Sequence, residues 1–254
     1  MKTKLTLIAL LVALISNVGL ADEKGLKIAR EADKRDTGFV DNTADMLMIL
    51  KNRQGQSSKR NMRLRTLEQK GDGDKSLVIF DRPKDVSGTA LLTYSHRNGI
   101  DDQWLYLPAL KRVKRIASNN KAGPFMGSEF AYEDLSSQEV DKYSWKFLRK
   151  EGNNFVLERV PKYKNSGYKR QIVWIDSTHY RTMKTEFYDR KNSKLKTLVL
   201  SGYKQYKNKF WRAAKMEMQN HQTGKSTTLQ WANYKFGTGL KSSHFTKNKL
   251  KRAR

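Results

Sequence analysis

The side chains that could carry out chemistry are few and scattered. The four histidines stand far apart along the chain: His96, His179, His221 and His244. No HExxH motif occurs and no two histidines are four residues apart, so a helical zinc site is excluded. Ligands can also assemble from distant positions, but nothing in the sequence indicates such a site, and we predict no metal. The chain has no cysteine, which excludes disulfides, thiolate metal sites and a cysteine nucleophile.

Acidic residues offer a second possible chemistry. Asp101 and Asp102 are adjacent, and Glu129 is followed by Glu133 and Asp134. Paired carboxylates can act as general acid and base when they are held close together. No nucleophile accompanies them, and the sequence has neither a GxSxG elbow nor a phosphate-binding glycine loop. We interpret the first pair as a turn and the second group as partners of cations or helix caps. We find no site for a hydrolase and predict a protein that is not an enzyme and has no cofactor.

The acidic residues belong to a stretch, residues 101–135, that places apolar side chains beside cations. Trp104–Leu107 is aromatic and aliphatic, and Lys111–Ile116 alternates basic with aliphatic residues. A loop of small residues then leads into Phe125–Phe130. This combination suits the binding of an amphiphile better than the cleavage of a bond.

The chain as a whole is strongly basic, with a formal net charge of +26 over 254 residues. Lysine and arginine are spread along its whole length. Such a charge predicts affinity for nucleic acid, for an anionic membrane surface or for acidic ligands. Apolar residues (37%) and aromatic residues (10%) suffice for a folded core.

The N-terminus has the three parts of a secretory signal. Lys2 and Lys4 precede an apolar run, Leu5–Ile15, which is too short for a stable membrane anchor. Small residues at Gly19 and Ala21 predict a signal peptide over residues 1–21, with cleavage after Ala21. The alternative is an uncleaved anchor or a buried first helix.

The remaining chain, residues 22–254, has the pattern of one antiparallel β domain. A short amphipathic helix is expected over residues 22–36, as a gate or lid or as packing on one end of a sheet. Residues 121–139 are expected to be looped or helical, and the tail 241–254 a short helix or a frayed end. Period-two alternation with turn residues at regular intervals predicts roughly eleven to thirteen strands. These strands are expected at 43–53, 59–69, 76–81, 88–96, 103–107, 112–117, 142–150, 154–160, 169–176, 180–189, 195–203, 209–220 and 225–236.

A sheet with this many strands must curl into a barrel or half-barrel, or split into a sandwich. Several strands carry large apolar groups on one face, and we expect that face to be the inner one. The residues are Tyr143, Trp145, Phe147, Ile172, Trp174, Met216, Met218, Leu229 and Trp231. They could pack only on one another, or they could line a ligand cavity, and the pattern leaves both open.

Two other classes fit the sequence less well. Basic strands with aromatic residues could bind single-stranded nucleic acid, but an export signal and dispersed charge argue against it, and no nucleic acid is expected. An outer-membrane barrel would expose cations such as Arg63, Arg65 and Lys196 to lipid, at a high cost.

The central stretch also resembles a known family. The segments WLYLPALKRVKRI at 104–116 and FMGSEFAYEDL at 125–135 are similar to periplasmic outer-membrane lipoprotein-sorting-like proteins, relatives of the carrier LolA. The segment FDRPKDVSGTALLTY at 80–94 and the early DMLMIL…GQ at 45–56 also fit. The resemblance implies a mainly β fold, an incomplete antiparallel β-barrel with short helices plugging the concave side. It also implies a periplasmic carrier of lipid or of lipoprotein acyl chains, and association with inner-membrane exporters of the resistance-nodulation-division type.

On this basis we expect a monomeric, non-enzymatic carrier that moves its cargo toward the outer membrane. The alternatives are an accessory protein of such an exporter with no lipid in the barrel, and an exported nucleic-acid-binding protein. Lys111, Arg112 and Arg115 would contact an anionic headgroup, a membrane surface or an acidic partner. The segment Phe125, Met126, Gly127, Ser128, Glu129 and Phe130 would form a loop at the mouth. The lipid-binding wall would be Met46, Met48, Leu64, Leu92, Trp104, Tyr106, Trp145, Phe147, Trp174, Met216, Met218 and Trp231.

Overall fold

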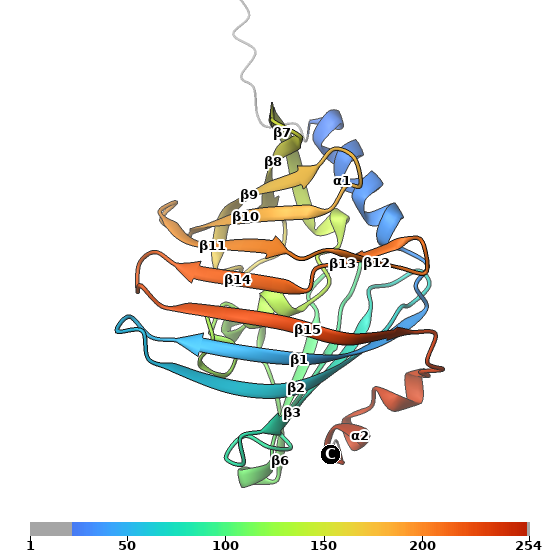
Figure 1. Cartoon of the computed structure of the whole chain (residues 1–254), viewed down its shortest axis with the longest axis vertical. Helices are drawn as coiled ribbons and strands as arrows, with labels where there is room; N and C mark the ends of the chain where they lie inside the picture. Colours follow the sequence, from blue (N-terminus) through green and yellow to red (C-terminus); the bar gives the residue numbers. More distant parts are fainter. Residues whose placement is uncertain (1–21, 253–254) are drawn as a thin grey trace, which may run out of the picture.

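One curved antiparallel sheet of thirteen strands dominates the computed structural model, which describes residues 22–252 (Figure 1). The strands lie in the order β6-β5-β4-β3-β2-β1-β15-β14-β11-β10-β9-β8-β7. The two edge strands, β6 and β7, do not pair with each other, so the sheet curls without closing. The predicted fold, a mainly β chain forming an incomplete antiparallel barrel, is confirmed.

The strands follow the predicted alternation closely. The strands before the central loops are β1 (Asp41–Lys51), β2 (Ser57–Leu67), β3 (Lys75–Arg82), β4 (Ala90–Tyr94), β5 (Asp102–Leu107) and β6 (Arg112–Arg115). Those after the loops are β7 (Tyr143–Glu151), β8 (Asn154–Pro161), β9 (Tyr168–Asp176), β10 (Thr182–Asp189), β11 (Lys194–Ser201), β14 (Lys215–Asn220) and β15 (Ser226–Phe236). A separate two-stranded sheet holds β12 (Lys204–Tyr206) and β13 (Phe210–Arg212).

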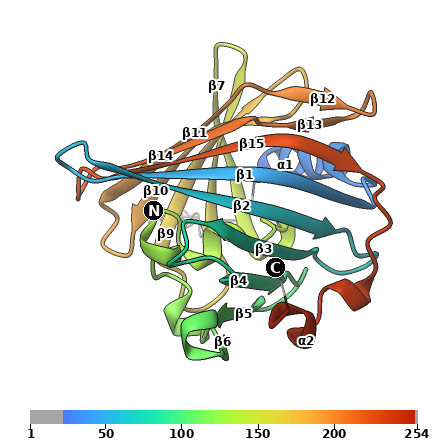
Figure 2. The same ribbon diagram turned by 60° about the horizontal axis from the view of Figure 1, so that its bottom comes forward.

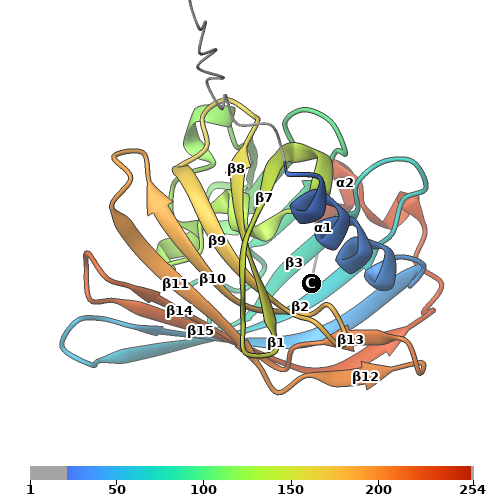
Figure 3. The ribbon, with the colours of Figure 1, turned by 90° about the horizontal axis from the view of Figure 1, so that it is seen from above.

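Cross-strand pairing determines which side chains share a face. Met46 lies opposite Met62, and Met62 lies opposite Phe80, so these three residues face the same side. This side is concave and is filled by other parts of the chain (Figure 3); we call it the inner face. Arg63 lies opposite Ile79 on the other side, the outer face.

The inner face is filled by residues 117–142, which we call the plug segment. It contains four short 3-10 helices, η2 (Ser118–Asn120), η3 (Phe125–Gly127), η4 (Tyr132–Leu135) and η5 (Val140–Lys142). Phe125 and Phe130 pack on Met46, Met62 and Phe80 in the largest hydrophobic cluster. The sequence prediction of a looped or helical interval here is correct, and the segment forms the helical plug that the resemblance implies.

Helix α1 (Glu23–Asp36) lies across the inner face at the β7 end of the sheet (Figure 3). Its N-cap residue Asp22 accepts a hydrogen bond from the Lys24 amide at 3.0 Å, which satisfies one free donor of the first turn. Ile28 and Ala29 are buried against Tyr143, Trp145 and neighbouring strands. The predicted helix is therefore present, and it covers one end of the sheet.

The C-terminal segment lies on the outer face of the first strands. It contains the 3-10 helix η6 (Ser242–His244) and the short helix α2 (Lys247–Leu250). Phe245 and Leu250 are fully buried against Leu77, Leu92 and their neighbours. The short 3-10 turn η1 (Pro108–Leu110) connects β5 and β6. Of the two expectations for the tail, the short helix is correct, and burial of two apolar side chains explains why it does not fray.

The strand predicted at 195–203 ends at Ser201, and the strand predicted at 209–220 is divided into β13 and β14. Gly202, with a φ of +64°, lies where L side chains are strained, and a Cβ there would approach Ala214 to 3.2 Å. The chain turns out of the main sheet at this point, so β12 and β13 form a separate hairpin beside α1 (Figure 3). Among the described residues, no helix is long and apolar enough to cross a membrane. The predicted signal peptide and its cleavage site lie outside the described residues.

Candidate functional site

A cavity of about 500 Å³ lies under α1. Its apolar lining comes from α1 and from the inner face of the sheet. It includes Ala32, Trp145, Val173, Leu200 and Met216. The end of the plug segment, at Ser137–Val140, and residues of the β12–β13 hairpin complete the lining. Cavities of this size hold small molecules or parts of larger ones. The half-barrel therefore retains open space at one end, although most of its inner face is packed.

Eight of the twelve predicted wall residues lie on the inner face. They are Met46, Met48, Leu64, Trp145, Phe147, Met216, Met218 and Trp231. Only Trp145 and Met216 line the cavity itself. Phe147 packs near α1, and the other five pack in the cluster that contains the plug segment. Most of the predicted wall is thus already covered by the protein's own chain.

Four predicted wall residues lie on the outer face, and for them the prediction of an inner position is wrong. Leu92 pairs with Trp104, and Ala90 pairs with Tyr106, in the cluster covered by the C-terminal segment. Trp174 packs with Val156 and Ile172 in a separate outer cluster. These strands carry apolar residues on both faces, so alternation alone did not reveal which face lies inside.

The contacts of Trp174 show why an outer tryptophan is stable there. Its indole Nε1 donates to the Glu151 Oε1 at 3.1 Å. The Lys184 ammonium lies 3.5 Å from the ring centroid. The attraction between a cation and the face of an aromatic ring is favourable, and the other side of the ammonium group can remain in contact with water. Trp174 is consequently held on the outer face, where it is only 7% exposed beneath charged side chains.

The segment Phe125–Phe130 lies deep in the plug, and its prediction as a mouth loop is wrong for most of its residues. Phe125, Ser128 and Phe130 are at most 3% exposed. The Phe125 ring lies 5.7 Å from the Phe80 ring, centroid to centroid, and Met126 packs against the same cluster. Gly127 and Glu129 line a smaller hollow of about 290 Å³ at the opposite ends of the strands. Phe125 and Phe130 are buried because removing an aromatic side chain from water is more favourable than leaving it exposed at the mouth of the barrel.

Buried ion pairs fasten the plug segment to the sheet. The Lys196 ammonium donates to the Asp134 carboxylate at 2.7 Å and to the Glu129 carbonyl at 2.8 Å. The two side chains of the Lys196–Asp134 pair are only 4% and 7% exposed. Lys142, also buried, contacts the Asp101 carboxylate. Lys196 was expected on the outer face, which is wrong, whereas the interpretation of Asp134 as the partner of a cation is correct.

Glu133 is a second buried anchor of the plug segment. Its Oε2 accepts hydrogen bonds from the Tyr163 hydroxyl at 3.0 Å and the Ser166 hydroxyl at 2.8 Å. Its Oε1 accepts from the Gly167 amide at 2.8 Å. Burial raises the pKa of the Glu133 carboxyl, and the neighbouring Asp134 raises it further. These contacts are structural, because every acceptor is occupied by groups of the sheet and its loops.

The lid helix α1, in contrast, is held mainly at its two ends. At its start, the Asp22 amide donates to the Trp145 carbonyl at 2.9 Å, and its carboxylate accepts from the Phe147 amide at 2.9 Å. At its end, Arg35 donates to the Thr178 carbonyl at 2.8 Å, and Arg212 contacts Asp36. Only Gly25, Ile28 and Ala29 of the helix are buried. The roof of the cavity therefore rests on few apolar contacts.

Charges in the cavity nearly balance, although the chain is strongly basic. Six acidic residues meet five arginines in its lining: Asp33, Asp36, Glu68, Asp72, Asp74 and Glu139 with Arg35, Arg97, Arg159, Arg181 and Arg212. Burial, with the nearby Glu139 and Glu68 carboxylates, raises the pKa of Asp74 to about 7. The excess of positive charge thus lies on the exterior and not in the cavity.

Comparison with known proteins places this half-barrel in a family. A model of a family of uncharacterized proteins matches residues 72–252. A domain from Vibrio parahaemolyticus, assigned to outer membrane lipoprotein sorting, is 61% identical with a TM-score of 0.89, over 91% of this chain and 99% of that one. The chain belongs to the same lipoprotein-sorting family as this domain. The resemblance seen in the central stretch is thereby confirmed.

Two further solved structures extend the comparison of this LolA-like protein. A DUF1329 family protein from Desulfovibrio piger is 30% identical with a TM-score of 0.85, over 91% of this chain and 99% of that one. A LolA superfamily protein from Nitrosomonas europaea is 19% identical with a TM-score of 0.72, over 89% and 98%, and shows the shared fold alone. No functionally curated protein matches the sequence.

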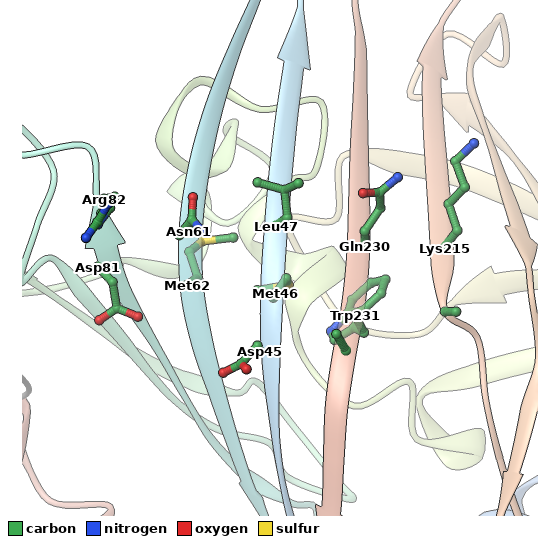
Figure 4. Close-up of a pocket in the computed structure, with 12 residues that line it drawn as sticks. Asp45, Met46, Leu47, Asn61, Met62, Asp81, Arg82, Lys215, Gln230 and Trp231 are labelled. Atoms are coloured by element: carbon green, nitrogen blue, oxygen red, sulfur yellow. The ribbon is translucent and has the colours of Figure 1, made fainter.

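The larger hollow of the LolA-like chain is an outer groove of about 690 Å³ (Figure 4). Strands β3, β2, β1, β15 and β14 contribute its lining. Leu47 and Gln230 lie opposite each other there, with Asp45, Asn61 and Lys215 nearby. The groove has mixed polarity and opens on the outer face, although Met46, Met62 and Trp231 from the inner-face set also contribute to its lining.

The three predicted headgroup contacts lie outside the cavity of this LolA-like protein. Lys111, Arg112 and Arg115 are exposed at the turn and strand that form one edge of the sheet. Arg115 contacts the Asp102 carboxylate, and Lys111 has a left-handed backbone with a φ of 47°. Within residues 22–252, no three histidine or acidic side chains come together as a metal site.

Proposed function

We propose that this LolA-like protein is a non-enzymatic periplasmic carrier. It binds lipid, or the acyl chains of a lipoprotein, under α1 and moves them toward the outer membrane. The observation that supports this proposal is the cavity of about 500 Å³ roofed by a helix with only three buried residues. Family membership supports the same class of function.

The apolar part of the cavity suits an acyl chain. Trp145, Val173, Leu200 and Met216 present aromatic, aliphatic and thioether groups to the open space. Each methylene group transferred from water to such a surface contributes about 0.8 kcal/mol. When α1 lifts, Leu157, which now lies in the cluster under the helix, becomes available in addition to Ile175, which already lines the cavity. An acyl chain would replace the contacts of α1 and cover the same surface.

The attachments of the two covering elements indicate that α1 is the part that moves. Displacing the plug segment would break the buried Lys196–Asp134 pair and would also expose Phe125 and Phe130, each of whose burial contributes about 1.5–3 kcal/mol. Helix α1 is attached to the sheet mainly at its ends, for example by the hydrogen bond from the 43% exposed Arg35 side chain to the Thr178 carbonyl, and a single hydrogen bond contributes about 0.5–1.5 kcal/mol. Loading therefore opens the roof and leaves the plug in place.

Native mass spectrometry of the protein purified from periplasm, with extraction of bound lipid, tests the proposal. A fluorescent fatty acid then measures affinity in solution. Ala32→Trp places a large ring in the cavity from the lid side, because Ala32 lines it. Lys34→Trp adds the same ring to the exposed face of the same helix and is the matched control. We expect Ala32→Trp to weaken binding of the fatty acid at least tenfold and Lys34→Trp to leave it unchanged.

Two results would contradict this function. If no lipid co-purifies and the fatty acid does not bind, the protein is not a lipid carrier. Retention of an exporter in a periplasmic pull-down would then favour the alternative, an accessory protein of an inner-membrane exporter. If lipid binds equally to Ala32→Trp and to the unchanged protein, the cavity under α1 is not the binding site.

A further inference from the structure

Two distant segments of the chain bring their cations together at one corner of the molecule. The turn and strand around β6 lie beside the C-terminal segment with α2 in both views (Figures 1 and 2). We call this surface the cationic corner. Its exposed cations are Lys111, Arg112, Lys114, Arg115, Lys241, Lys247, Lys249, Lys251 and Arg252.

Specific contacts fix the C-terminal segment at this corner. Phe245 and Leu250 are fully buried in the outer cluster, and the Tyr94 hydroxyl donates to the Phe245 carbonyl. The Lys247 ammonium lies 5.5 Å from the centroid of the Trp104 ring. Trp104 is itself paired across the strands with Arg115. The cations of the two segments therefore lie around one shared tryptophan.

The charges of the corner are largely unneutralised. Asp102 contacts Arg115, and it also lies 3.3 Å from His96. In the part of the chain that the structure describes, the other eight cations of the corner form no ion pair within 4 Å. Holding so many like charges on one small surface costs free energy, and an anionic surface would offset this cost.

An exposed leucine stands among these cations. Leu110 is 63% exposed, at the end of the turn η1 and directly before Lys111. The left-handed backbone of Lys111 ends this turn, after which the chain enters β6. An apolar side chain surrounded by cations matches the boundary of a bilayer, where acyl chains meet anionic headgroups.

Two simpler explanations cover only part of the corner. Lysines on an edge strand prevent pairing with other chains, which accounts for Lys114 on β6. That reason does not apply to Lys247 or Lys249, which lie on helix α2 and not on an edge strand. Binding of single-stranded nucleic acid needs aromatic faces free for stacking, and the Trp104 ring is already half-buried with Lys247 over it.

We propose that the cationic corner docks on a membrane surface that carries anionic phospholipids, with Leu110 entering the boundary of the headgroups. Docking of this kind positions the carrier at its membrane without any contact inside the cavity. The proposal concerns a surface separate from the cavity under α1 and does not depend on lipid being bound there.

Vesicle flotation with the full chain tests the proposal. The probes are vesicles of phosphatidylcholine alone and vesicles that also contain phosphatidylglycerol. The triple variant Lys111→Gln, Lys114→Gln, Lys249→Gln removes three corner charges. The matched control, Lys34→Gln, Lys150→Gln, Lys204→Gln, removes three exposed charges from α1, β7 and β12. Circular dichroism melting verifies that each variant is folded.

We expect binding to the phosphatidylglycerol vesicles only, weakening as salt rises. Each lost cation should lower the partition coefficient about fivefold, so the corner variant should bind about a hundredfold more weakly. The control variant should lose far less, because its charges lie away from the docked surface. Leu110→Ser should weaken binding about fivefold at constant charge.

Equal binding by the corner variant and its control would overturn the proposal, as would equal binding to both kinds of vesicle. Binding of an oligonucleotide that survives physiological salt, with no vesicle binding, would assign the corner to nucleic acid instead. The corner variant should keep fatty-acid loading, and Ala32→Trp should keep vesicle binding. A failure of docking is therefore distinguishable from a failure of the proposed carrier function.

Discussion

The plug segment and the lid helix α1 both cover the inner face of the same sheet, and they are held in different ways. The plug buries Phe125 and Phe130, and its Asp134 and Lys142 pair with Lys196 and Asp101 inside the protein. The lid buries three small or aliphatic residues and is fastened mainly at its ends. The same apolar surface is thus closed permanently at one end and only lightly at the other.

This difference assigns the two elements different tasks. A buried ion pair adds little net stability over apolar packing, but removing one partner is costly, so the plug has one arrangement. End contacts on an exposed helix are individually weak and can be exchanged for water. On these grounds we propose that the plug is a rigid floor and that α1 is a roof that lipid can displace.

Removal of a plug aromatic should have the largest effect. Phe125→Ala should lower the free energy of unfolding by about 3–5 kcal/mol, because the fully buried ring leaves a cavity among packed strands. Urea denaturation measures the change. Leu110→Ala, at a position that is 63% exposed, is the control and should change stability by less than about 0.5 kcal/mol. A loss below about 1 kcal/mol for Phe125→Ala would show that the plug is not rigid.

A truncation on the lid should have a smaller and more local effect. Ile28→Ala removes the longest buried side chain of α1 and should weaken lid closure by about 2 kcal/mol. Hydrogen exchange should become faster in residues 23–36, while exchange in the plug segment remains slow. If exchange accelerates equally in both regions, the lid and the plug form one cooperative unit and the distinction between them is wrong.

The raised pKa of the Asp74 carboxyl should make the stability of the protein depend on pH. The pKa of Asp74 rises from 3.8 to about 7 on folding, so the folded protein holds a proton that the unfolded chain has lost. Stability should therefore fall as pH rises from about 4 to about 7. Asp74→Asn should stabilise the protein by about 2 kcal/mol at about pH 8, roughly half the value for an isolated group, and hardly at all at about pH 4.

Thermal melts at the two pH values measure this difference for Asp74→Asn. Asp45→Asn, at an exposed position on the outer face, is the matched control and should behave the same at both. A stabilisation by Asp74→Asn that does not depend on pH would mean that the carboxyl is charged throughout.

The smallest effect is expected for Gly25→Ala. Whether this change stabilises or destabilises the closed lid shows whether α1 needs a glycine at this position. In an exposed helix, alanine is favoured over glycine by about 1 kcal/mol. Here a Cβ would lie 2.7 Å from the Phe147 amide nitrogen and 2.8 Å from the Lys146 carbonyl carbon, both backbone atoms. Gly25→Ala should therefore destabilise lid closure by about 1 kcal/mol, detected as faster exchange in α1. A stabilised lid would show that α1 does not need this close approach.

Much of the fold could be predicted from the sequence. Met62 and Leu64 alternate with Arg63 and Arg65 in the sequence, and in β2 the first two lie on the inner face and the other two on the outer face. The break in alternation after β6 marks the plug segment, and the small residues of α1 mark a helix that lies close to the sheet. The candidate site was harder to predict from the sequence. Lys196 has the same local pattern as a surface lysine, and yet it pairs with Asp134, 62 residues away.

The sequence by itself determined the fold class, because turn spacing and period-two alternation are local properties of the chain. It also determined that Trp104, Tyr106 and their neighbours share a face. Only the tertiary structure decided that this face is the outer one, covered by Phe245 and Leu250 from the end of the chain. The stretch 101–135 accordingly divides into an outer cationic edge and a buried plug. The alternation within a strand shows which side chains share a face. Which of the two faces becomes the interior depends on the distant segments of the chain that cover it.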